Sequence, residues 1–357
     1  MSIGKIIYYH RKKQKMKQAQ LCAGICSITH LSKIENNVNA VASDETLQLL
    51  CERLKVSIEE ENKKYHVLKE KLTLFYDAME RIHRVKADEL YEEVLNHSDY
   101  IQCTDLIYLF ELFKLRYLLF TSRIQEFELE SKKMIKNITK LNPFELFLWE
   151  FLQAIYNGQI QMFEKSLEIL SRLESQADQY SEKVSDFYFY KSVMHGNLDQ
   201  HSLSIHYIYK VLPYLQDNCN VIRILHVKAG LSINLIYLGE FEKSEKILTS
   251  ILNCSELLQD TNVRGLILHN FGFLNHKQGN FQRALEFYHQ SLQFKQINTN
   301  TYYHTIKFII DTHIELKQFN EAIKLLKAEL GSIQNKKSNN YVQLKNIYLK
   351  VKGKKSA

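Results

Sequence analysis

Hydrophobic residues recur every three or four positions through most of the chain, which is the spacing of one face of an α-helix. In the first sixty residues this pattern is broken into short pieces, and we expect five short helices there. The first spans Ile3–Lys13, and two more, near residues 18–24 and 27–35, are separated by a tight turn. Ser27 is a suitable N-cap for the third helix, because its hydroxyl can accept a hydrogen bond from an amide of the first turn.

The predicted third helix has an inward face and an outward face. Leu31 and Ile34 lie three residues apart and share the inward face. The remaining positions are available for contacts outside the domain, and they are Ile28, Thr29, His30, Ser32 and Lys33. A short helix with hydrogen-bonding residues on its exposed N-terminal half suits the major groove of DNA.

Composition and charge support this interpretation. The 357 residues include only 2 prolines and 11 glycines, which favours long helices and an all-α fold over a turn-rich β fold. The net charge is a modest +7, but its distribution is uneven. Between Met1 and Ile34 there are seven Lys and Arg residues and no acidic residue, which is typical of a surface that contacts phosphates.

Residues 1–62 resemble the lambda-repressor-like helix-turn-helix family. The matching pieces include Ile3-Gly4-x-x-Ile7, Gln18-x-x-Leu21 and Ser27-x-x-x-Leu31-Ser32-Lys33-Ile34-Glu35. The resemblance implies a buried ion pair between Arg11 and Glu35 and a phosphate contact from Gln18. The chain departs from the family at Lys15, where a glycine is usual, and at Ala42, where a proline is usual. The DNA-binding residues predicted in this way are Gln18, Ser27, Ile28, Thr29, His30, Ser32, Lys33 and Asn37.

Residues 63–99 are predicted to be linker helices. They are rich in Lys and Glu, and their apolar positions recur at helical spacing from Tyr65 to Ile82. A dimer seam and a core for the following helices explain this apolar stripe equally well.

Residues 100–357 contain a repeat. An aromatic residue is followed three positions later by a small residue in Phe241–Ser244, Phe281–Ala284 and Phe319–Ala322. The candidate turn positions Gly158, Gly196, Gly239, Gly279 and Lys317 are spaced by 38, 43, 40 and 38 residues. A period near forty built from two helices predicts a right-handed α-solenoid with a concave groove.

The strongest copy, Asn270–Leu292, resembles a tetratricopeptide repeat. In that family the residues at fixed distances before the turn position face the groove. Groove positions that mix polar and apolar residues suit an extended peptide, and the amides of Asn234 and Asn270 can both donate to and accept from its backbone. Counted from the turn positions, with these two amides added, the predicted peptide-binding residues are Lys183, Asp186, Tyr190, His226, Ile233, Asn234, His269, Asn270, Phe273, Lys277, His304, Lys307 and Asp311.

Catalytic and metal-binding motifs are absent from the sequence. The six cysteines and fourteen histidines are dispersed without ligand spacing, so we expect no enzyme activity, no metal and no cofactor. The first residues are too polar for a signal peptide, and no apolar run is long enough for a membrane span. The expected location is therefore the cytoplasm.

A helix-turn-helix domain followed by degenerate tetratricopeptide repeats resembles the peptide-pheromone receptors of Gram-positive bacteria, the Rap, Rgg, NprR, PlcR and PrgX group. The segment from Ile25 to Glu35 is PlcR-like. This resemblance implies a homodimeric transcription regulator of the quorum-sensing type, which binds double-stranded operator DNA and is switched by a short signalling peptide. The alternative is a DNA-binding regulator or scaffold whose repeats bind a protein partner.

Overall fold

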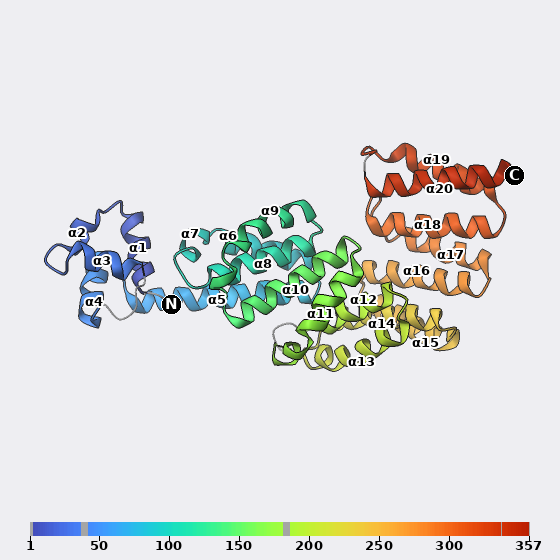
Figure 1. The fold of residues 1–357 in the computed structure, drawn as a ribbon. Helices are drawn as coiled ribbons and strands as arrows, with labels where there is room; N and C mark the ends of the chain where they lie inside the picture. Colours follow the sequence, from blue (N-terminus) through green and yellow to red (C-terminus); the bar gives the residue numbers. More distant parts are fainter. Residues whose placement is uncertain (1–2, 37–41, 181–185, 337, 357) are drawn as a thin grey trace. The chain divides into compact units, whose positions relative to one another are not determined.

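The computed structural model describes residues 3–36, 42–180, 186–336 and 338–356, and in these ranges the chain forms helices and no strands (Figure 1). The chain divides into two compact units, Met1–Val184 and Ser185–Ala357. The predicted all-α class is confirmed.

The first unit begins with four short helices that enclose a small core. These helices are α1 (Ile3–Lys13), α2 (Gln18–Cys22), α3 (Ile28–Glu35) and α4 (Asp44–Arg53). Their core contains Ile7, Leu21, Leu31, Leu50 and Leu54. Gly4 brings α1 close to α3, because a Cβ at this position would lie 2.0 Å from the Ile34 carbonyl oxygen. These contacts hold α3 in a single orientation.

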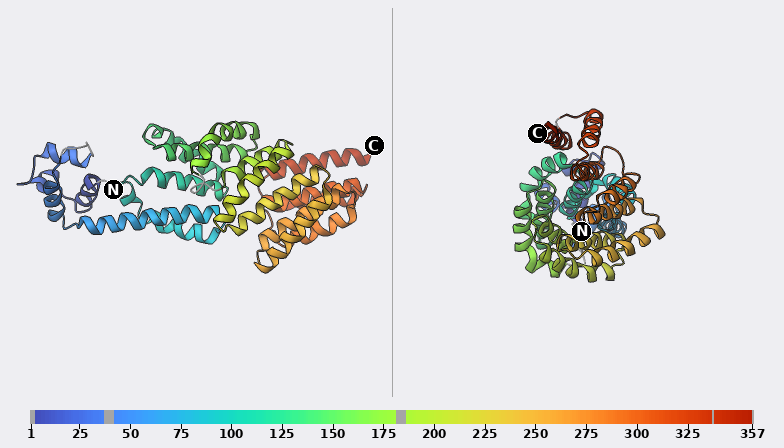
Figure 2. Two further views of the ribbon diagram at one scale, coloured as in Figure 1. Left: turned by 90° about the horizontal axis from the view of Figure 1, so that it is seen from below. Right: turned by 90° about the vertical axis from the view of Figure 1, so that its right-hand side faces the viewer.

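The fifth helix, α5 (Ile58–Glu80), differs from the expected short helix. Ser57 caps it by accepting a hydrogen bond from the Glu60 amide, and the helix continues for 23 residues without a break. Figure 2 shows it as one long rod. Nothing interrupts it, because residues 58–80 contain neither Gly nor Pro. The helix therefore belongs both to the N-terminal domain and to the helices that follow.

The apolar stripe of α5 is buried inside the chain, where it packs against α6 (Arg84–Leu95) and α8 (Ile107–Phe120). Leu68, Leu72, Phe75 and Met79 are each at most 2% exposed. Of the two explanations for this stripe, a core for the following helices is the one that the structure supports.

Helix pairs continue through the rest of the first unit. Its remaining helices are α7 (Ser98–Ile101), α9 (Ile124–Ile135), the 3-10 helix η1 (Ile138–Lys140), α10 (Pro143–Gln159), α11 (Phe163–Ala177) and the 3-10 helix η2 (Asp178–Tyr180). The pairs α8–α9 and α10–α11 pack side by side.

The second unit consists of helix pairs and a final helix. It contains α12 (Phe187–Asn197), α13 (His201–Asp217), α14 (Val221–Tyr237), α15 (Phe241–Leu257), α16 (Thr261–Lys277), α17 (Phe281–Leu292), α18 (Asn300–Glu315), α19 (Phe319–Ser332) and α20 (Asn339–Ser356). Each helix packs against the next one in the chain.

The turn inside each helix pair contains one residue with a left-handed backbone. These residues recur every 38 to 40 positions, and they are Ile82, Ser122, Gln161, Asp199, Gly239, Gly279 and Lys317. The prediction placed two of these turns at Gly158 and Gly196, which is wrong by three residues, because both glycines lie inside helices. Glycine is favoured at such a turn but is not required, since other residues adopt this conformation at a modest cost. The prediction therefore took a nearby glycine for the turn residue at both positions.

Small residues allow the two helices of a pair to approach each other. Ser166, Ser204, Ser244, Ala284 and Ala322 are at most 1% exposed. The serines at these positions can also bond to the facing helix, as Ser244 Oγ does by donating to the Ser232 carbonyl at 3.0 Å. The recurring small residue of the repeat therefore lies where the two helices of a pair meet.

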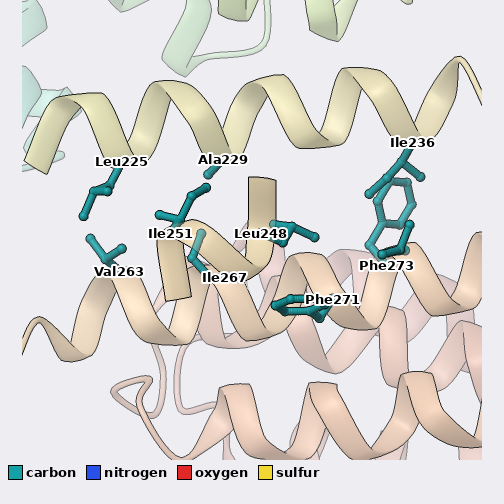
Figure 3. Packing of buried hydrophobic residues seen from close by; sticks show 10 residues of the cluster. Leu225, Ala229, Ile236, Leu248, Ile251, Val263, Ile267, Phe271 and Phe273 are labelled. Atoms are coloured by element: carbon teal, nitrogen blue, oxygen red, sulfur yellow. The ribbon is translucent and has the colours of Figure 1, made fainter. Parts of the chain in front are cut away.

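One hydrophobic core of the second unit lies between α14, α15 and α16 (Figure 3). Ala229 and Ile236 of α14 meet Ile251 of α15 and Ile267 and Phe273 of α16. Because every helix contributes apolar residues to both neighbours, the unit is held together pair by pair.

Gly272 provides a test of this packing. A Cβ at Gly272 would lie 2.5 Å from the ring of Tyr288, which is fully buried. We expect Gly272→Ala to lower the free energy of unfolding by about 1–3 kcal/mol through overpacking, measured by urea unfolding. Gly331→Ala is the matched control, because nothing lies within 4 Å of its added Cβ. Equal stability of the two variants would contradict the close approach.

Candidate functional site

The outward face of α3 forms the candidate DNA-binding surface. Ser27 caps the helix by accepting a hydrogen bond from the His30 amide at 3.1 Å, as predicted. Leu31 and Ile34 are buried, and this leaves Thr29 and Lys33 exposed on the opposite face. The helix therefore presents a hydroxyl and an ammonium group to the outside.

The other predicted DNA-binding residues differ in exposure. Ser27 and Ile28 are exposed, whereas His30 and Ser32 are half-buried. Gln18 is half-buried, and its Nε2 donates to Glu35 Oε2 at 2.8 Å, so in this structure its side chain is engaged within the domain. Asn37 lies outside the described residues.

The expected ion pair between Arg11 and Glu35 is present and buried. Arg11 Nε lies 2.5 Å from Glu35 Oε1, and a second guanidinium nitrogen donates to Glu35 Oε2 at 2.8 Å. A third donates to the Met16 carbonyl at 3.0 Å. The hydrogen bond to Glu35 raises the pKa of Arg11. This bidentate pair connects α1 to the end of α3 and so orients α3.

Lys15 explains one departure from the family pattern. It has φ of 55°, which is the left-handed conformation that glycine adopts without strain. The turn that the family builds with glycine is therefore preserved here with a lysine.

Removing one partner of the Arg11–Glu35 pair should destabilise the N-terminal domain. We expect Arg11→Met to cost about 3–5 kcal/mol, because Glu35 would be left buried and unpaired. The double variant Arg11→Met/Glu35→Met should recover part of this loss. Hydrogen exchange of the α1–α4 amides measures both effects, and purely additive losses would contradict the pairing.

A cavity of about 310 Å³ lies in the second unit. It is lined by Phe189, Ser192, Val193, Gly196, Asn197, His201, Ser204, Ile208, Val227, Gly230, Ile233, Asn234, Tyr237, His269, Asn270, Phe273, His304 and Phe308. Most of these residues lie on the first helices of successive pairs, α12, α14, α16 and α18, with others on α13. A cavity with apolar walls and a few polar groups is typical of a ligand site.

Six of the predicted peptide-binding residues line this cavity, and they are Ile233, Asn234, His269, Asn270, Phe273 and His304. Five of the others, Tyr190, His226, Lys277, Lys307 and Asp311, are described but do not line it. Asp186 is fully buried and accepts a hydrogen bond from Arg223 at 3.3 Å. Lys183 lies outside the described residues.

The error in turn register explains the residues that the prediction missed on α12. Counted from Asp199 instead of Gly196, the same groove positions fall on Asp186, Phe189, Val193, Gly196 and Asn197, and all of these except Asp186 line the cavity. His201, Ser204 and Ile208 were missed for another reason. They belong to the second helix of a pair, and the repeat pattern assigns groove positions only to the first.

Two asparagines stand out among the lining residues. Asn234 is bonded within the protein, because its Nδ2 donates to Ser204 Oγ at 2.9 Å and its Oδ1 lies 3.0 Å from His201 Nδ1. Asn270 is 1% exposed, and its Nδ2 donates to the Ala229 carbonyl at 3.4 Å, but no described residue donates a hydrogen bond to its Oδ1. A buried acceptor without a partner is costly. A ligand amide can supply the missing donor.

His269 makes the stability of the second unit depend on pH. Burial lowers its pKa well below the usual value, and the charges of Lys295 and His304 add to this. In the unfolded chain the same imidazole takes up a proton at higher pH. Stability is therefore lost as the pH falls below about 6.5.

We expect His269→Gln to reduce this loss of stability between neutral and acidic pH, measured by urea unfolding across the pH range. The matched control is His206→Gln, because His206 is exposed. A pH dependence that is the same in both variants would mean that His269 does not contribute.

No cluster of His, Cys, Asp or Glu suited to a metal ion occurs among the residues that the structure describes. Within those same ranges, no helix combines the length and apolarity needed to cross a bilayer.

Comparison with known proteins finds matches both for the N-terminal domain alone and for most of the chain. Residues 7–60 match the family model described as helix-turn-helix. The transcriptional activator NprA of Geobacillus stearothermophilus is 26% identical over 319 residues, covering 88% of this chain and 78% of NprA. The regulatory protein RapG of Bacillus subtilis (strain 168) is 22% identical over 260 residues, covering 70% of this chain and 69% of RapG.

The crystal structure of NprR in complex with its cognate peptide NprX has the same fold. Its TM-score is 0.69 at 22% sequence identity, covering 80% of this chain and 84% of NprR. The predicted resemblance is confirmed. The chain combines a helix-turn-helix domain with a tetratricopeptide-like solenoid related to NprA and the Rap proteins.

Proposed function

We propose that this chain is a transcription regulator that binds operator DNA through α3 and is switched by a short signalling peptide held in the cavity of its second unit. The observation that carries this proposal is the presence, in one chain, of a helix-turn-helix domain and a cavity with an unpartnered buried amide oxygen. The chain is proposed to act without catalysis, in the cytoplasm.

The proposed DNA contacts follow from exposure and charge. Thr29 and Lys33 are exposed on α3. Basic residues outnumber acidic ones throughout the surrounding segment, and Lys12, Lys13 and Lys17 are also exposed. Lysines of this kind neutralise phosphates, and side chains on the helix read base edges. Gln18 reaches a phosphate only if it releases Glu35.

The proposed peptide site follows from the polar groups of the cavity. Asn270 offers an acceptor for a backbone amide, and Phe273 and Phe308 offer apolar contacts for side chains. A cavity of about 310 Å³ suits a few residues of an extended peptide rather than the surface of a folded protein. A protein partner in place of a peptide is the alternative, and a failure of all short peptides to bind would favour it.

A homodimer is part of the proposal. Two helix-turn-helix domains related by a two-fold axis read a palindromic operator. The peptide acts as a switch only if it binds one arrangement of the dimer more tightly than another.

Replacing base-reading residues should weaken specific DNA binding. We expect Thr29→Ala and Lys33→Ala each to reduce affinity for the selected operator, by about 1–3 kcal/mol where a good base contact is lost. The operator is first selected from a random DNA pool with the wild-type protein. Lys132→Ala is the matched control, because Lys132 is an exposed lysine on α9. Unchanged affinity in both α3 variants would favour a scaffold with an inactive DNA domain.

Replacing Asn270, whose side-chain oxygen lacks a partner among the described residues, should weaken peptide binding without unfolding the protein. We expect Asn270→Leu to lower affinity for peptides encoded beside the gene, measured by calorimetry, because the buried acceptor is lost. Asn253→Leu is the control, because Asn253 is exposed on α15. If operator affinity and oligomeric state of the wild type are the same with and without every candidate peptide, the proposed switch is wrong.

A further inference from the structure

One end of the cavity contains a chain of polar contacts that leads to a lysine. His269 of α16 and His304 of α18 line this end, and their rings lie 4.9 Å apart. His269 Nδ1 lies 3.1 Å from Thr305 Oγ1. Thr305 is fully buried, and its Oγ1 accepts a hydrogen bond from Lys295 Nζ at 2.5 Å. Lys295 belongs to the loop between α17 and α18.

The positive charge at this end is not balanced. None of the side chains that line the cavity is acidic. In the described part of the chain Lys295 forms no ion pair, and its hydrogen-bond partner is a neutral hydroxyl. Burial alone lowers the pKa of Lys295 to about 8. Lys307, one turn beyond His304, is different, because it donates to Gln343 at 2.7 Å and interacts with Asp311.

An unbalanced cation in a partly buried environment favours an anionic ligand. Water solvates it poorly there, and an opposite charge placed nearby gains more than it would at an open surface. His304 is exposed to the cavity and can donate through its ring to an acceptor. Phe273 and Phe308 make the adjoining walls apolar. The anion that fits is therefore one attached to a partly apolar molecule.

We propose that the end of the cavity lined by His269 and His304, with Lys295 behind them, receives a carboxylate of the bound peptide. This inference rests on the proposed peptide-binding function. It fixes one anchoring point of the peptide at the α16–α18 side of the cavity, whereas Asn234 lies on α14. The carboxylate comes from the peptide C-terminus or from an acidic side chain.

The test uses the full-length protein and two kinds of probe. The first pair is N-acetylglycine, which mimics the C-terminal residue of a peptide, and the neutral N-acetylglycinamide. The second is a random heptapeptide library prepared as free acids, as C-terminal amides, and as amides without Asp and Glu. Binding of the small probes is measured by the thermal stabilisation of the protein, and binding of the libraries is measured by their retention on immobilised protein.

Lys295→Met removes the charge and keeps the apolar stem, so we expect this variant to fold. The matched control is Lys246→Met, because Lys246 is exposed on α15. In the wild type and the control, we expect N-acetylglycine to stabilise the protein more than N-acetylglycinamide. In Lys295→Met this preference should disappear, with a loss of about tenfold or more in affinity for the carboxylate.

The outcomes separate the two proposals. If the free-acid library is retained better than the amide library, the carboxylate is that of the peptide C-terminus. If the amide library is retained better than the amide library without Asp and Glu, the carboxylate is an acidic side chain. A third outcome is that no library is retained, but N-acetylglycine stabilises the wild type more than N-acetylglycinamide does and this difference is lost in Lys295→Met. That result would support the carboxylate site and contradict the proposed peptide-binding function. Equal response to acid and amide probes, or a preference that survives in Lys295→Met, overturns the carboxylate site.

Discussion

The close approach of two helices within each pair is the constraint on which the structure depends. A single helix of this chain cannot bury its apolar face, so each must find a neighbour at short distance. Small residues such as Ser244, Ala284 and Ala322 permit that approach, and Gly272 does the same against Tyr288. A left-handed residue every 38 to 40 positions reverses the chain between the two helices. The cavity exists because pairs built in this way place their first helices side by side.

Buried polar groups have two different roles in the molecule. Arg11 and Glu35 form a bidentate pair that the Met16 carbonyl and the Gln18 side-chain amide complete, and this pairing orients α3 without needing any ligand. Asn270 and Lys295 are not satisfied in the same way, since within the described ranges one lacks a donor and the other lacks a counter-charge. The first kind of group stabilises a domain. The second kind is a cost to the folded protein that a ligand can offset.

The helix α5 connects the N-terminal domain to the helices that follow it. It closes the N-terminal domain through Glu61, which lies 2.9 Å from His10, and its later turns form the core beneath α6 and α8. Tyr9 of α1 also meets Tyr100 of α7, with ring centroids 5.3 Å apart. The helix-turn-helix domain is therefore packed onto the first helices of the repeats rather than joined to them by a loose linker.

The sequence by itself determined most of the helices, the caps and the small residues of the repeat, because these depend on neighbours at short and regular spacing. The Arg11–Glu35 pair joins residues 24 positions apart, and it was expected only from the resemblance to the helix-turn-helix family. Only the tertiary structure decided the register of the turn at Asp199, since a left-handed residue other than glycine leaves no mark in the sequence. It also decided that Gln18 binds Glu35 and that Lys295 lies behind His269. Such contacts join residues far apart in the chain, and their distances follow from how whole helices pack.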